Sequence, residues 1–134
     1  MAGQEDLIMN VDRRNGTEPR RWCFQFFPNA ASNPTHQSRG NIVAGVLHTA
    51  TGRYQCILNP GAASSLSQVV GRFAHLGAVA ASANRAQVGA ITFSATTGQL
   101  TVMVHTVDAA GAEVDIAANA DTIVNVEILT DAAA

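Results

Sequence analysis

The stretch from Gln87 to Leu129 constrains the fold more than any other part of this 134-residue chain. Two runs rich in valine, isoleucine, threonine and phenylalanine, 88–94 and 99–107, flank a turn at 96–98. A third such run covers 121–129, after a loop of small residues. β-Branched and aromatic residues suit a pleated, half-buried surface, and glycine-bearing turns between such runs are typical of antiparallel sheets. The stretch therefore predicts three strands joined as a meander.

Four further strands are expected earlier in the chain. Apolar and β-branched runs predict them at 22–27, 42–47, 53–58 and 69–81. Trp22, Phe24 and Phe26 share one face of the first run, and aromatic rings clustered in this way usually form core. The segment 28–40 has the composition of a loop, and 59–68 predicts a loop or a single helical turn.

The second and third of these runs predict a hairpin that turns at 49–52. Gly45 is a candidate bulge within it. Tyr54, Cys56 and Leu58 fall on one face by the two-residue period of a strand.

The predicted fold class is all-β: a two-sheet antiparallel sandwich, jelly-roll-like or related to the immunoglobulin fold, with about seven to eight strands. In 1–20, asparagine, aspartate, glycine and proline interrupt any helical period, so we expect an extended N-terminal arm there. The rest of the chain, 21–134, is long enough for one β-sandwich domain and too short for two ordinary domains.

The composition narrows the function classes. A hydrophobic fraction of 47% excludes a disordered chain, and the charged fraction of 13% is about half the usual share. Such a chain either hides surface against other copies or a larger partner, or has an alanine-rich, weakly charged surface. The net charge of −2 offers no general attraction to nucleic acid or anionic membrane, and no run approaches the ~20 apolar residues of a membrane span.

The charges are unevenly distributed. All eight basic residues are arginine; five lie in the first forty residues, and none follows Arg85. Six acidic residues occur from Asp108 onward. Arginine binds carboxylates in a fork, so an arginine-bearing arm and an acidic end can meet in neighbouring subunits. Solvated charges on a flexible arm are the alternative.

Cys23 and Cys56 lie inside apolar runs, and we expect both to be buried free thiols. A disulfide between them is the alternative, and it would require their Cα atoms to lie within about 7 Å of each other. The N-terminus is acidic and lacks the apolar core of a signal peptide, so synthesis in a cytoplasm is expected.

No catalytic motif is found. His48, His75 and His105 lie on predicted strands, while His36 lies in the predicted loop, and their spacings form no local ligand pair. The three serines between Ser64 and Ser67 lack a nearby histidine partner. Phosphate-cradling glycine loops are also missing. We therefore predict no catalytic, cofactor-binding or metal site, and a protein that is not an enzyme.

The acidic residues of the late loops are Asp108, Glu113, Asp115 and Asp121. Loop carboxylates are ordinarily solvated, which is the expectation for all four. Calcium binding through their oxygen atoms is the alternative, although the EF-hand pattern is absent.

Three segments carry a resemblance to a known family. They are the run from Gly52 to Leu58, which closes a hairpin with Gly-x-Tyr, the Ala-Ala-Gly loop of 109–115, and the final alternating strand of 124–129. In these features the chain resembles head decoration, or cement, proteins of tailed bacteriophages. The likeness covers 41–129. The aromatic run 22–27 and the loop after it have no counterpart in the pattern.

The resemblance implies a jelly-roll-like homotrimer on the outer surface of a virion capsid, made in the host cytoplasm. Such a protein binds the major capsid protein and other copies of itself and stabilises contacts between neighbouring major capsid proteins. We expect no nucleic-acid or membrane partner and no cofactor. From charge rather than from the family pattern, the expected contacts with the capsid or other subunits are Arg13, Arg14, Arg20 and Arg21.

C1q-like and fibre-tip jelly-roll proteins resemble the chain in the same way, by the placement of their turns and the composition of their strands. The alternative function is therefore a receptor- or glycan-binding module, with its binding groups in loops such as 28–40.

Overall fold

The computed structural model describes residues 19–38, 40–77, 84–116 and 122–131, and these residues form eight strands. The strands are β1 (Arg20–Phe27), β2 (Thr35–Ser38), β3 (Val43–Ala50), β4 (Arg53–Leu58), β5 (Val69–Gly77), β6 (Arg85–Phe93), β7 (Leu100–Val107) and β8 (Ile123–Thr130). A 3₁₀ turn, η1 (Leu66–Gln68), precedes β5. No helix in these ranges is long and apolar enough to cross a membrane.

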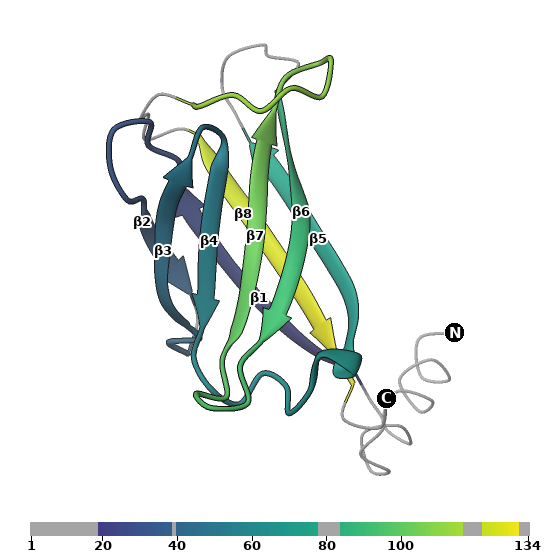
Figure 1. Ribbon diagram of the computed structural model, residues 1–134. Helices are drawn as coiled ribbons and strands as arrows, with labels where there is room; N and C mark the ends of the chain where they lie inside the picture. Colours follow the sequence, from purple (N-terminus) through teal and green to yellow (C-terminus); the bar gives the residue numbers. More distant parts are fainter. Residues whose placement is uncertain (1–18, 39, 78–83, 117–121, 132–134) are drawn as a thin grey trace, which may run out of the picture.

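The strands form two antiparallel sheets of four that pack face to face (Figure 1). Sheet A has the order β2-β1-β8-β5, and sheet B has the order β3-β4-β7-β6. The consecutive pairs β1–β2, β3–β4 and β6–β7 each stay within one sheet, the other connections cross between the sheets, and β1 pairs with β8 in the middle of sheet A. The predicted fold class, an all-β antiparallel sandwich, is confirmed.

The core lies between the sheets. Phe24 and Phe26 of β1 point inward with alternate residues of β8, and both are buried. The Phe26 and Tyr54 rings join the two sheets with their centroids 5.0 Å apart. Trp22 is partly buried, and its indole N–H donates to Thr130 Oγ1 at 2.8 Å. Since each fully buried large apolar side chain contributes about 1.5–3 kcal/mol, the aromatic face of β1 is a main source of stability, as predicted.

The hairpin of β3 and β4 also follows the prediction. Tyr54, Cys56 and Leu58 are fully buried on one face of β4. The register of β3 shifts by one residue just before Gly45, which confirms the predicted bulge. One turn of 3₁₀ helix at η1 confirms the helical alternative for that loop.

The predicted meander is wrong in its last step. β6 and β7 pair as a hairpin, but β8 crosses to sheet A and lies between β1 and β5. The two-residue alternation predicts a strand without saying which sheet it joins. In the structure, the inner face of β8 packs beside the aromatic residues of β1, whereas both edges of β7 are already paired, with β4 and with β6.

The bounds of several elements also differ from the predictions. β2 lies inside the predicted 28–40 loop; its four residues, Thr-His-Gln-Ser, are polar and mostly exposed, so no apolar alternation marks them. β6 begins at Arg85, before the predicted run 88–94. β5 is described to Gly77, and the remainder of its predicted range, 78–81, lies outside the described residues.

Gly52 closes the β3–β4 turn with a φ of +66°, a conformation that L side chains rarely adopt. A Cβ atom there would lie 2.6 Å from the Thr106 carbonyl oxygen and 2.8 Å from the Val114 nitrogen. Both neighbours are backbone atoms, so neither can swing aside.

We expect Gly52→Ala to lower the free energy of unfolding by about 2–4 kcal/mol, because it adds both strain and a clash. Gly45→Ala is the matched control: its Cβ would meet nothing within 4 Å, and a change within about 0.5 kcal/mol is expected. Urea unfolding of both variants measures the difference. Equal effects would contradict the role given to Gly52.

Candidate functional site

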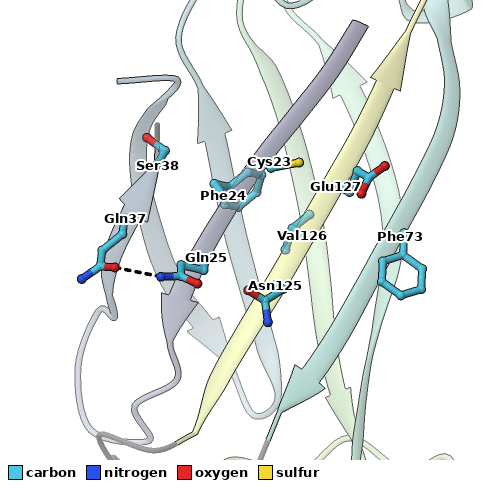
Figure 2. Close-up of a pocket in the computed structure, with 9 residues that line it drawn as sticks. All are labelled: Cys23, Phe24, Gln25, Gln37, Ser38, Phe73, Asn125, Val126 and Glu127. Carbon is cyan, nitrogen blue, oxygen red and sulfur yellow. Dashed lines mark hydrogen bonds between the residues drawn. The ribbon is translucent and has the colours of Figure 1, made fainter. Parts of the chain in front are cut away.

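An open groove of about 640 Å³ lies on the outer face of sheet A (Figure 2). Its floor is the two central strands, β1 and β8, and its sides come from β2 and β5. The residues that line it are Cys23, Phe24, Gln25, Gln37, Ser38, Phe73, Asn125, Val126 and Glu127. Phe24 and Val126 are buried toward the core, so the remaining side chains define the chemistry of the groove.

One row of polar side chains crosses all four strands of the sheet. By register, Gln37 of β2 lies opposite Gln25 of β1, which lies opposite Asn125 of β8, and His75 of β5 completes the row. Gln25 Nε2 donates to Gln37 Oε1 at 2.8 Å. Neighbouring strands are about 4.8 Å apart, so the row presents three amides side by side.

A second row contains Cys23, Glu127 and Phe73. Arg21 Nε lies 3.0 Å from Glu127 Oε1, which ties this carboxylate to the start of β1. Phe73 is 58% exposed, an unusual position for a phenyl ring. The groove therefore combines neutral amides, one partly neutralised carboxylate and an uncovered aromatic ring.

The Cys23 thiol is exposed, which corrects the expectation that both thiols are buried; Cys56 is buried, and both are free. Partial burial raises the pKa of Cys23, and the Glu127 charge adds to this while Arg21 opposes it. Burial also strongly raises the pKa of Cys56. Since the thiolate is the nucleophile, neither position is activated for covalent chemistry.

The predicted contact arginines are only partly described. Arg20 and Arg21 begin β1, so the first strand includes the last residue assigned to the arm. Arg21 pairs with Glu127 of the same chain. Arg13 and Arg14 lie outside the described residues.

Arg20, Thr130 and Val69 are aligned across sheet A, so β1 starts where β8 ends and β5 begins. We call this the η1 end of the sandwich (Figure 1). Leu66 and Val70 are 48% and 52% exposed there. A hollow of about 340 Å³ beside them is lined by Leu66, Val69, Val70, Gly71, Arg72 and Ile91.

At the other end, the loop after β7 is fixed to the β3–β4 hairpin. Val114 N donates to the Thr106 carbonyl at 2.9 Å, and Thr106 Oγ1 donates to the Val114 carbonyl at 2.7 Å. Asp115 Oδ1 accepts from Gly52 N at 2.7 Å and lies 2.9 Å from His48 Nε2. These contacts position the loop rather than leave an open site.

Glu113 strengthens the same attachment. Its Oε2 accepts from Arg53 Nε at 2.7 Å, and its Oε1 lies 3.4 Å from His105 Nδ1. The Arg53 hydrogen bond lowers the pKa of Glu113, and the Gly52 N–H lowers the pKa of Asp115. Both carboxylates are still about 30% exposed, so they are partly solvated, as expected, and are in addition bonded to groups of the same chain. Asp121 lies outside the described residues.

Tyr54 lies between this loop and the core. Its ring is stacked on His48 with centroids 5.1 Å apart. The hydroxyl is close to the Asn29 backbone and the Thr106 side chain, but with neither does it reach the geometry of a hydrogen bond. Burial, with the charge of Asp115, raises the pKa of Tyr54 to about 12. The phenol therefore stays protonated at neutral pH.

The predicted strand histidines, His48, His75 and His105, lie on β3, β5 and β7. Within 19–38, 40–77, 84–116 and 122–131, no three His, Cys, Asp or Glu side chains come close enough to hold a metal ion. His48 and His105 contact different carboxylates, and His75 ends the amide row.

The groove was not predicted from the sequence, because the predicted contacts were arginine residues and loops. The sequence nevertheless contains a pattern that indicates it. Gln25 interrupts an aromatic run, and Asn125 and Glu127 interrupt a valine and isoleucine run, at alternate positions. Polar residues at that period mark the outward face of a central strand.

Comparisons with known proteins place the chain in no family. No protein-family model, no curated protein and no solved structure matches it.

The two thiols are expected to differ in reactivity. Maleimide treatment of the native protein at about pH 7 labels Cys23, more slowly than a free cysteine because its pKa is raised, and leaves Cys56 unlabelled. Denaturant exposes both. Intact-mass and peptide mass spectrometry measure the sites. Native labelling of Cys56 would contradict its burial.

Stability is expected to fall in acid. Because the folded-state pKa of Asp115 and of Glu113 is lowered, their contribution is complete above the ordinary carboxyl pKa of about 4 and is lost as the pH falls through the folded value. Asp115→Asn removes one titration, so Tm should depend less steeply on pH below about 4. Thermal unfolding across this range tests it; an unchanged slope contradicts it.

Proposed function

We propose that this chain is a structural protein that binds the outer surface of a bacteriophage capsid as a decoration protein and stabilises contacts between major capsid proteins. The observation that carries the proposal is the η1 end, where the exposed side chains of Leu66 and Val70 line a hollow, at the same end of sheet A as Arg20. Exposed apolar surface next to a cavity is typical of protein–protein contact sites. The resemblance in 41–129 supplies the kind of partner.

The apolar contribution of the η1 end is modest. Leu66 and Val70 are each about half exposed, so covering both contributes on the order of 2 kcal/mol. A single contact of this size is weak. An assembly of several linked copies can bind a symmetric shell at several points at once. This multivalency makes the overall attachment strong even though each contact is weak.

The arginine residues also favour contact with the capsid through the η1 end. Arg20 lies at the η1 end, where β1 begins, and Arg13 and Arg14 precede it in the sequence. Guanidinium groups bind carboxylates in a fork and tolerate interfaces well. We propose that these arginines contact acidic groups of the capsid protein. Arg21 is different, because Glu127 already binds it.

We further propose that the protein is a homotrimer. Its charged fraction of 13% leaves little charged surface for a free monomer. Among the described strands, β5 pairs with β8 alone, which leaves a strand edge that a neighbouring copy can cover. Closed symmetry limits such pairing to a defined assembly instead of a growing fibre.

The attachment is tested with expanded, DNA-free heads of the virus whose genome encodes the chain. We expect saturable binding in a sedimentation assay, and a solution mass three times the 13.9 kDa of one chain by light scattering. Leu66→Asp and Val70→Asp should each weaken head binding at least about tenfold, because a charge would be buried on docking.

Leu47→Asp is the matched control, since Leu47 is 38% exposed on sheet B, away from the η1 end, and should bind normally. Light scattering that gives one chain mass would refute the trimer. A source genome without a major capsid protein, or heads that bind no protein, would refute the decoration function.

A further inference from the structure

We propose that the groove on the outer face of sheet A binds a neutral saccharide. This site is separate from the η1 end, which is proposed to contact the capsid. Its volume of about 640 Å³ lies within the range of small-molecule sites, about 300–1,000 Å³. The proposal depends on three features of the groove: an amide row, an exposed ring and a floor whose backbone is fully paired.

The amide row has the hydrogen-bonding capacity that sugar hydroxyls require. Each side-chain amide offers two donors and an acceptor oxygen, and a hydroxyl group both donates and accepts. The bond between Gln25 and Gln37 uses one donor and one acceptor, and holds both amides in place. No hydrogen bond joins the Asn125 side chain to any other residue that the structure describes. Asn125 is therefore available at the centre of the row.

Phe73 provides a surface for the apolar face of a sugar ring. Its side chain is 58% exposed, and it projects from β5 across the groove from Gln25 and Gln37 (Figure 2). Asn125 and Glu127 lie between these two sides. A pyranose ring laid across β8 meets the amides with its hydroxyl groups and the phenyl ring with its C–H face.

The floor of the groove disfavours a peptide that binds as an added strand. β1 pairs with β2 and β8, and β8 pairs with β1 and β5, so the backbone groups of both central strands are already used. An extended peptide gains affinity by pairing with a free strand edge. This groove offers side chains alone, which suits a ligand rich in hydroxyl groups.

Charge disfavours an anionic ligand. Glu127 is the acidic group of the groove, and Arg21, the nearby cation, is already paired with it at 3.0 Å. A phosphate or a sialic acid would meet this carboxylate without a free arginine to compensate. The geometry therefore points to a neutral sugar.

The test starts from the full-length chain on an array of neutral and sialylated oligosaccharides. The best neutral glycan is then titrated by two-dimensional ¹H–¹⁵N NMR. We expect a dissociation constant of roughly 0.1–10 mM, typical of a shallow, solvent-exposed site, and shift changes at Gln25, Asn125 and Phe73.

Single substitutions separate the contributions. Asn125→Ala and Gln25→Ala should each weaken binding about tenfold, because each removes hydrogen bonds to hydroxyl groups. Phe73→Leu should weaken it by a similar factor, whereas Phe73→Tyr keeps the ring and the affinity. Gln87→Ala is the control: Gln87 is an exposed amide on sheet B and should bind like the unsubstituted chain.

Several outcomes would overturn the proposal. They are no glycan binding at about 10 mM ligand, preference for sialylated glycans, binding that survives both Asn125→Ala and Phe73→Leu, or shifts confined to other parts of the chain. Saturation of the same groove by a peptide would overturn it in favour of a protein ligand. Binding to phage heads is tested with the Leu66 and Val70 variants, and saccharide binding with the variants of the groove. Either proposal can therefore fail without the other.

Discussion

Burial of one face of β8 is the interaction on which the rest of the structure depends. Val124, Val126 and Ile128 are each at most 2% exposed, and the strand that carries them pairs with both β1 and β5. The intervening residues, Asn125 and Glu127, then point outward by the two-residue period and enter the groove. Core and groove are therefore built from the same strand, and a register slip would exchange them.

Local pattern predicts the strands well and their partners poorly. The aromatic face of β1, the β3–β4 hairpin and the bulge before Gly45 follow from residues close in sequence. The sheet that β8 joins depends on apolar surface roughly a hundred residues away, which no local window contains; Trp22 and Thr130, bonded across this pair, are 108 positions apart. β2 has no apolar face, so nothing in its own sequence marks it as a strand.

The site was less predictable than the fold for a similar reason. Glu113 and Asp115 read as solvated loop carboxylates, and only the folded chain brings Arg53 and the Gly52 N–H to them. Arg21 reads as part of an arm, but its partner is on β8. The amide row forms only when β2, β1 and β8 pair in register. Within their own strands, Gln25 and Asn125 are each recognisable as polar residues that interrupt an apolar run.

Pairing of the first strand with the last has a consequence for synthesis. A ribosome adds about 5–20 residues each second, so β1 and β5 wait several seconds for β8. Until Thr130 emerges, sheet A lacks the strand that separates them, and the inward rings of β1 have no partner on that side. Sheet B, whose four strands are complete at Val107, can assemble first. We therefore expect sheet A to close late, once β8 has been synthesised.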